Sequence, residues 1–223
     1  MHPLLTADLI YAYRTDGVTL IRGMFADCVE PLRDGVAFNL QHPGPYAAEN
    51  LTDTESGRFF DDYCNWTRIP EFSDVIHRPH IAQIAAELMG SDIVQLFHEH
   101  VLVKEPGTSK PTPWHSDAPY YFTGGQQNIS FWVPLDPVKE NSLRVVAGSH
   151  KWQKPVLPTR WLSEQNFYPD SDLYQPVPDP DAEGMNIIEY IMQPGDAVAF
   201  HFNALHGARG NHSAKRRRAF SLR

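Results

Sequence analysis

The sequence predicts a mainly β domain with helices at its N-terminal end, and three observations support this prediction. Before residue 90, apolar side chains recur at helical spacing, whereas from residue 92 onward they alternate with polar ones. The 19 prolines fall between short apolar runs, which is typical of a chain of strands and turns. The 223 residues show no internal repeat, so we expect one domain over 1–223, mostly helical at 1–90 and with the β core at 92–223.

The expected helices lie in four segments of the first 90 residues. Residues 4–14 are short and amphipathic, and residues 27–40 are predicted to form a helix with Asp27 as its N-cap. A third helix is expected after Ile69. A fourth begins at Pro79 and ends at Gly90, since proline suits the first turn of a helix and glycine the position after its end. Residues 41–70 are predicted to be irregular.

The expected strands begin at residue 92, and two of them alternate clearly. Over 92–104, one face carries His98, His100, Leu102 and Lys104. Over 126–135, one face is polar or mixed and the other apolar, so we expect the first to line the core and the second to meet the helices. The first face holds Gln126, Asn128, Ser130 and Trp132. The second face holds Ile129, Phe131, Val133 and Leu135. Further strands are expected at 141–149, 185–192, 197–202 and 216–222. Residues 153–184 hold six prolines and no period, which predicts a long loop or lid.

Composition limits the classes of function. The 19 basic and 27 acidic residues give a net charge of −8, which disfavours nucleic acid or an anionic membrane as the main partner. No run approaches the roughly 18 apolar residues of a membrane span, and the N-terminus lacks the basic region of a secretory signal. Two cysteines fit a reducing compartment. We therefore expect a cytoplasmic protein whose main partner is neither nucleic acid nor a membrane.

The clearest chemical signal lies at residues 113–117. His115 and Asp117 are two positions apart, so in an extended segment their side chains point the same way. A third ligand would complete a two-histidine, one-carboxylate site of the kind that leaves positions open on Fe(II). Taken alone, the pair is equally compatible with a surface hydrogen bond. The candidate third ligand is His206, which follows the strand at 197–202, and His201 is its rival.

A basic run at residues 215–218 adds a second signal. Arg217 lies eleven residues after His206, and strand alternation places Arg217 and Ser221 on one side, with Arg216 and Arg218 on the other. An inward arginine with a nearby hydroxyl suits a carboxylate ligand. The alternative for Arg216 and Arg218 is a solvated basic face.

These motifs resemble the phytanoyl-CoA dioxygenase family. The matching features are His-Ser-Asp at 115–117, the segment at 141–150, His-Gly at 206–207 and the downstream arginine, with Ser142 and Ala208 departing from the usual pattern. The resemblance implies a double-stranded β-helix, a jelly-roll of the cupin-like kind, and an enzyme that uses Fe(II), 2-oxoglutarate and O2. Relatives usually continue past the arginine strand, so a C-terminal extension is also expected.

The resemblance also implies a role for individual residues. His115, Asp117 and His206 would bind iron, and Arg217 would pair with the far carboxylate of 2-oxoglutarate. Further cosubstrate positions are matched by Leu102, Ser130, Trp132, Ser221 and His100. Candidate substrate contacts are His98, Tyr120, Phe122 and Asn128.

The predicted function is hydroxylation or desaturation of a small organic molecule, with release of succinate and CO2. Two alternatives stay open. One is a cupin-like metal enzyme that does not use 2-oxoglutarate, in which Arg217 has no such role. The other is a non-catalytic barrel that binds a ligand.

Overall fold

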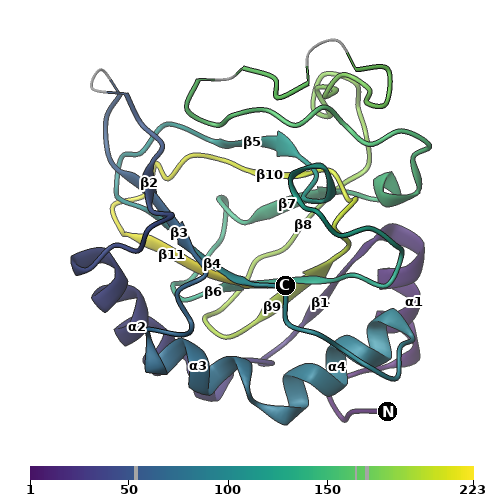
Figure 1. Cartoon of the computed structure of the whole chain (residues 1–223), viewed down its shortest axis with the longest axis horizontal. Coiled ribbons are helices and arrows are strands. Elements are labelled where there is room, and N and C mark those ends of the chain that lie inside the picture. The colour runs from purple at the N-terminus through teal and green to yellow at the C-terminus, as the bar shows by residue number, and fades with distance from the viewer. Residues whose placement is uncertain (53–54, 164, 169–170) are drawn as a thin grey trace.

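The computed structural model describes residues 1–52, 55–163, 165–168 and 171–223, and consists of two facing antiparallel sheets with helices against one of them (Figure 1). The helices are α1 (Ala7–Asp16), α2 (Val29–Gln41), α3 (Pro70–Ile76) and α4 (Pro79–Met89). The strands are β1 (Val18–Ile21), β2 (Ala48–Glu49), β3 (Phe59–Tyr63), β4 (Glu99–Lys104), β5 (Thr112–His115), β6 (Ser130–Pro134), β7 (Leu143–Val146), β8 (Ile187–Glu189), β9 (Ala197–Phe200), β10 (His206–Ala208) and β11 (Arg217–Leu222).

The larger sheet has the order β1-β9-β6-β11-β4-β3-β2, and the smaller sheet has the order β5-β10-β7-β8. Both are antiparallel, and neighbouring strands come from distant parts of the chain, as in a jelly-roll. The mainly β architecture with N-terminal helices is therefore confirmed. None of the helices in the described part of the chain is long and apolar enough to cross a membrane.

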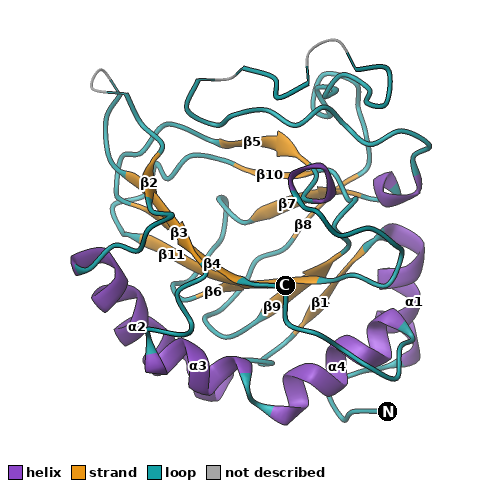
Figure 2. Cartoon of the chain, in the orientation of Figure 1, coloured by secondary structure: helices purple, strands orange, loops and turns teal. Residues whose placement is uncertain are grey.

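The helices cover the outer face of the larger sheet (Figure 2). Helix α4 shows why they do so: Ile81, Ile84 and Leu88 recur at helical spacing and are buried, and Gly90 ends the helix in the left-handed conformation. Burial of each such side chain stabilises the fold by about 1.5–3 kcal/mol. These side chains pack in one cluster with Phe131 of β6, so the helices fix the outer face of the sheet.

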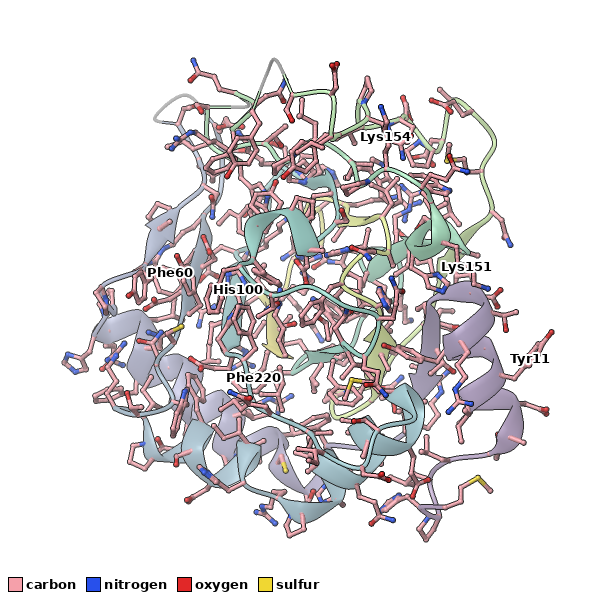
Figure 3. The ribbon with its side chains drawn as sticks, turned by 45° about the vertical axis from the view of Figure 1, so that its right-hand side comes forward. Tyr11, Phe60, His100, Lys151, Lys154 and Phe220 are labelled. Carbon is pink, nitrogen blue, oxygen red and sulfur yellow. The ribbon has the colours of Figure 1, made fainter. Side chains whose placement is uncertain are left out.

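The alternation predicted for residues 126–135 is confirmed. Phe131 and Val133 lie in the cluster beneath the helices, whereas Trp132 lies in a second cluster between the sheets. The same alternation holds on the neighbouring strands, where Phe220 lies nearer the helices than His100 (Figure 3). The space between the sheets is thus lined by one parity of β3, β4, β6 and β11.

Three predicted boundaries were wrong. Residues 41–70 are not irregular throughout, because they form β2 and β3. The sequence did not predict β3 because Asp61 and Asp62 interrupt the apolar alternation. Both aspartates are nevertheless buried, and their carboxylates accept hydrogen bonds from partners such as Asn39. Helix α2 begins at Val29, after a 3₁₀ turn over Ala26–Cys28.

The side chain of Asp27 does not cap α2, because it faces Arg78 across a distance of 3.2 Å. Strand β4 begins at Glu99 rather than residue 92.

The loop expected at 153–184 is present in its described part. Between β7 and β8 the structure describes no strand or helix after the short 3₁₀ turn Ser149–Lys151, only isolated bridges such as Val156 to Gln175. Residues 164, 169 and 170 of this stretch lie outside the described residues. We call the segment 153–184 the lid.

Candidate active site

Two neighbouring strands of the smaller sheet bring together three side chains of the types that ligate metals. Strands β5 and β10 pair in antiparallel fashion with His115 directly opposite His206, and Asp117 follows the end of β5 (Figure 1). All three residues are buried, and one donor atom from each lies within 4.8 Å of the others. The Nε2 atoms of His115 and His206 lie 3.7 and 3.8 Å from Oδ1 of Asp117. The structure therefore assembles the predicted three-residue cluster.

Backbone carbonyls orient the two imidazole rings. Nδ1 of His115 lies 2.8 Å from the carbonyl oxygen of Pro113, and Nδ1 of His206 lies 2.9 Å from that of Ala204. A carbonyl only accepts hydrogen bonds, so each Nδ1 carries the proton and each Nε2 keeps its lone pair. Both lone pairs are thus available on the side of the ring that faces Asp117, as a metal ligand requires.

The protonation states also suit a cation. Burial, and then the nearby His206, lower the pKa of His115 to about 3. Burial likewise lowers the pKa of His206. Burial alone would raise the pKa of Asp117, but Arg223 and the two imidazoles hold it well below its usual range. Two neutral imidazoles and one carboxylate fit a divalent metal and leave coordination positions open on it.

The second carboxylate oxygen of Asp117 has partners of its own. Oδ2 accepts hydrogen bonds from the hydroxyl of Ser130 at 3.2 Å and from Nε of Arg223 at 3.1 Å. Ser130, predicted near the cosubstrate, thus contacts a residue of the cluster. The sequence analysis missed Arg223, although the alternation of Arg217 and Ser221 extends to it once the strand is known to continue.

Two further buried cations lie where β11 begins, at the end of the β4–β11 pairing that is distant from Arg223. Arg217 of β11 is directly opposite Lys104 of β4, and the two residues are 4% and 0% exposed. Both donate to backbone carbonyls and share one of them: Nζ of Lys104 and Nη1 of Arg217 lie 3.3 and 3.5 Å from the carbonyl oxygen of Arg209. Nζ of Lys104 also donates to the carbonyl of Lys110, and Nη1 of Arg217 to that of Asn141.

These two cations have no carboxylate within ion-pair distance among the residues that the structure describes. Nε of Arg217 and the hydroxyl of Ser221 are buried and without a hydrogen-bond partner there. Burial lowers the pKa of Arg217 to about 10. Burial, and then the charge of Arg217, hold the pKa of Lys104 well below its usual range. Because a buried cation is unfavourable without a counter-charge, Arg217 and Lys104 suit an anionic ligand.

Five of the other predicted residues lie at or near the interior between the two sheets. Leu102 and Trp132 are buried on the inward faces of β4 and β6. Nε2 of His100 lies 2.7 Å from Oδ2 of Asp61, so His100 pairs with a carboxylate of this chain. His98 is buried and is opposite Arg223 across the continued ladder. The ring of Tyr120 lies 6.0 Å from that of His115, and its hydroxyl donates to the carbonyl of Thr159 in the lid.

Two predicted substrate contacts lie outside this region, and His201 is not a ligand of the cluster. Phe122 is 93% exposed and stacks its ring edge against Phe97. The side chain of Asn128 closes the local turn, bonding to the carbonyl of Gly125 and the amide of Phe202. The two ring nitrogens of His201 bond to the backbone of Gln126 and Asn203. Asn128 lies before β6 and Phe122 lies in a loop, so strand alternation does not determine where their side chains point.

One residue of the lid reaches the cluster. The ring of Trp161 lies 5.1 Å from that of His115 and 6.0 Å from that of Phe59, which in turn lies 4.2 Å below Nζ of Lys104. The path of a long loop sets this contact, so the sequence carried no signal for it. Trp161 therefore lies between His115 of the three-residue cluster and Phe59, the ring that contacts Lys104.

The fold and the cluster together define a class: a jelly-roll protein with a buried two-histidine, one-carboxylate site. The family model for phytanoyl-CoA dioxygenase matches residues 13–219. The chain therefore belongs to the phytanoyl-CoA dioxygenase family. A curated Arabidopsis thaliana protein named phytanoyl-CoA dioxygenase is 23% identical over 155 residues, which are 69% of this chain and 52% of that protein. The chain thus spans about half the length of that relative.

Solved structures of similar fold support the same architecture. The carbocyclase SnoK from nogalamycin biosynthesis has a TM-score of 0.76 at 22% identity, covering 98% of this chain and 83% of that chain. The epimerase SnoN, solved with Fe3+ and alpha ketoglutarate, has a TM-score of 0.78 at 22% identity, covering 96% and 81%. EctD from S. alaskensis, solved with 2-oxoglutarate and 5-hydroxyectoine, has a TM-score of 0.73 at 22% identity, covering 98% and 75%. At this identity the similarities establish the fold.

Proposed function

We propose that the chain is an Fe(II)- and 2-oxoglutarate-dependent dioxygenase that hydroxylates or desaturates a small organic substrate, with release of succinate and CO2. The observation that carries the proposal is the buried cluster in which two Nε2 lone pairs and one carboxylate oxygen converge. The family supports it, as do the Fe3+ and alpha ketoglutarate in the SnoN structure. Fe(II), 2-oxoglutarate and O2 together supply the oxidising power needed to attack an unactivated C–H bond.

His115, Asp117 and His206 are the residues that would hold the iron. Three protein donors of this kind would leave the metal able to accept further ligands, as 2-oxoglutarate-dependent chemistry requires. Ser130 keeps Asp117 oriented through its hydroxyl. The carbonyls of Pro113 and Ala204 fix the rings of the two histidines.

Arg217 and Lys104 would hold the far carboxylate of 2-oxoglutarate. This dianion brings one carboxylate to the metal, and the other needs a buried cation as partner. Nε of Arg217 and the hydroxyl of Ser221 are the unpartnered donors there, and Lys104 adds a second positive charge. Leu102 and Trp132 would form the apolar walls between the two ends.

The substrate would lie on the side of the cluster that the lid covers. Tyr120 and Trp161 face His115 there, and His98, which directly precedes β4, is a further candidate. The proposed partner is therefore a small molecule, with no nucleic acid and no membrane. We propose the cytoplasm as its location, since Cys28 and Cys64 are both unpaired thiols.

The decisive experiment compares His115→Ala and His206→Ala with His201→Ala. The first two variants should lose Co(II) or Fe(II) binding and succinate formation, because two remaining ligands hold a metal poorly, whereas His201→Ala should keep both. Unchanged metal binding in His115→Ala and His206→Ala would refute the cluster. Uptake of O2 by the metal-loaded protein without 2-oxoglutarate would instead support the cupin-like alternative.

A further inference from the structure

We propose that Arg223 is a positioning residue that restricts Asp117 to one metal-binding oxygen and offers its remaining N–H donor to an anionic ligand of the metal. The inference rests on the proposed function and deepens it. It assigns a role to a side chain that touches the metal cluster but contributes no ligand atom itself.

The backbone explains how Arg223 reaches the cluster. Its amide donates to the carbonyl of His98 at 3.0 Å, and its carbonyl accepts from the amide of Phe97 at 2.8 Å, so the ladder between β11 and β4 continues past Leu222. Alternation then points the side chain of Arg223 to the same interior as that of Arg217. The side chain is only 6% exposed.

The two carboxylate oxygens of Asp117 have different partners. Oδ1 faces the Nε2 atoms of His115 and His206, whereas Oδ2 is held by Nε of Arg223 at 3.1 Å and by the hydroxyl of Ser130. A carboxylate that bound a metal through both oxygens would use two coordination positions. Because Oδ2 is already engaged in a charge-assisted hydrogen bond, Asp117 uses one. The extra position stays available for the cosubstrate.

The guanidinium of Arg223 has a further N–H group that donates no hydrogen bond to the described residues. Nη1 of Arg223 is buried and has no hydrogen-bond partner among the described residues. The ring of Tyr121 lies 5.8 Å from the guanidinium carbon and closes one side. A buried N–H without an acceptor is costly, so a native structure keeps one mainly where a ligand or water supplies the acceptor. An anionic oxygen bound next to Asp117, such as the keto-acid carboxylate of 2-oxoglutarate, is the acceptor of matching charge.

The test uses Co(II) as the metal probe and three variants. Arg223→Gln removes the charge, and Arg223→Lys keeps the charge but not the fork. Arg216→Gln is the matched control, because Arg216 precedes the inward arginine in the chain and instead pairs with Glu105 on the surface. Titration calorimetry gives the Kd for Co(II), and then the Kd for 2-oxoglutarate on the Co(II)-loaded protein. The visible spectrum of Co(II) reports any change in coordination.

We expect Arg223→Gln to bind 2-oxoglutarate at least tenfold more weakly on the Co(II)-loaded protein and to change the Co(II) spectrum. Arg223→Lys should recover the spectrum but only part of the 2-oxoglutarate affinity, and Arg216→Gln should match the wild type. Should Arg223→Gln not fold, the same comparison is made on Arg223→Lys. Wild-type spectrum and 2-oxoglutarate affinity in the Arg223 variant would overturn the inference. Absence of Co(II) binding by the wild type would overturn the proposed function itself.

Discussion

Arg217 and Arg223 point into the same interior from one continuous stretch of chain, yet their surroundings differ. Arg223 meets Asp117 in an ion pair whose two side chains are 6% and 5% exposed. Arg217 meets Lys104, another buried cation, and backbone carbonyls. One end of the ladder is electrostatically complete in the protein itself. The other end carries positive charge that the described residues do not balance.

This difference predicts that the two arginines contribute differently to the stability of the ligand-free protein. A buried ion pair is costly to break because the remaining partner stays buried and uncompensated. A buried cation without an anion already lowers the free energy of unfolding, and it becomes favourable only when an anion binds. Removal of the arginine should therefore have opposite effects on stability at the two ends, and each prediction below tests that contrast.

The largest expected effect follows Arg217→Ala. A carboxylate of 2-oxoglutarate left buried without its arginine should lose about 3–5 kcal/mol of binding free energy, a factor of about 150 to several thousand. The apparent KM for 2-oxoglutarate measures this, with Arg218→Ala as the control, because Arg218 faces outward to Asp136. A large effect in Arg218→Ala alone would mean that the other parity of the strand faces the site.

The next effect concerns stability of the protein without ligands. Arg223→Met should lower the free energy of unfolding by about 3 kcal/mol, because Asp117 would remain buried without its cation. Arg217→Met should leave it unchanged or raise it, since no carboxylate loses a partner. Urea denaturation of the two variants in metal-free buffer gives both values. Equal destabilisation would contradict the distinction between the two ends.

Much of this contrast could be predicted from the sequence, and the missing part has a physical cause. The pair His115 and Asp117 and the inward face of Arg217 were predicted from spacing and strand parity, and His206 from the family resemblance. Lys104 was placed on the right face of its strand, but its position opposite Arg217 is a matter of register between strands that are far apart in the sequence.

Other features carried no local signal. Arg223 depends on where the last strand ends, and Trp161 depends on the path of the lid. Strand β3 was missed because its two aspartates are buried and pair with distant residues such as Asn39 and His100. Spacing and the family resemblance thus predicted a three-residue cluster, two members of which lie on the paired strands β5 and β10. They did not predict the contacts that Arg223 and Trp161 make with it.

A smaller effect is expected for Lys104→Met. Replacing an unpaired buried cation with an apolar side chain of similar length should raise the free energy of unfolding of the ligand-free protein by about 1 kcal/mol. The same change should weaken 2-oxoglutarate binding by about tenfold, or about 1.4 kcal/mol. Thermal unfolding with and without 2-oxoglutarate measures both. A variant that is less stable and binds 2-oxoglutarate normally would show that Lys104 only anchors the carbonyls of Lys110 and Arg209.

Lys104 also predicts a pH dependence. The charged side chain facing it is Arg217 from β11, and Phe59 faces it from β3 without charge. Because its pKa is well below the usual value in the free protein, and a bound carboxylate would raise it, binding should take up a proton above the lowered pKa. The affinity for 2-oxoglutarate should then fall as the pH rises. Calorimetry in two buffers of different ionisation enthalpy detects the proton, and Lys104→Met should abolish it.

The smallest effect should follow Trp161→Ala, which tests whether the anion site belongs to the strands alone. Trp161 contacts the rings of His115 and Phe59 but offers no charge or metal ligand, so its removal should change the Kd for Co(II) and for 2-oxoglutarate by less than about twofold, or about 0.4 kcal/mol. The lid should remain the first segment cut in limited proteolysis, because loops with few backbone hydrogen bonds open most easily. A rise in the 2-oxoglutarate requirement as large as that of Arg217→Ala would place the lid within the anion site. In that case the unbalanced charge of Arg217 and Lys104 would not by itself define where the cosubstrate binds.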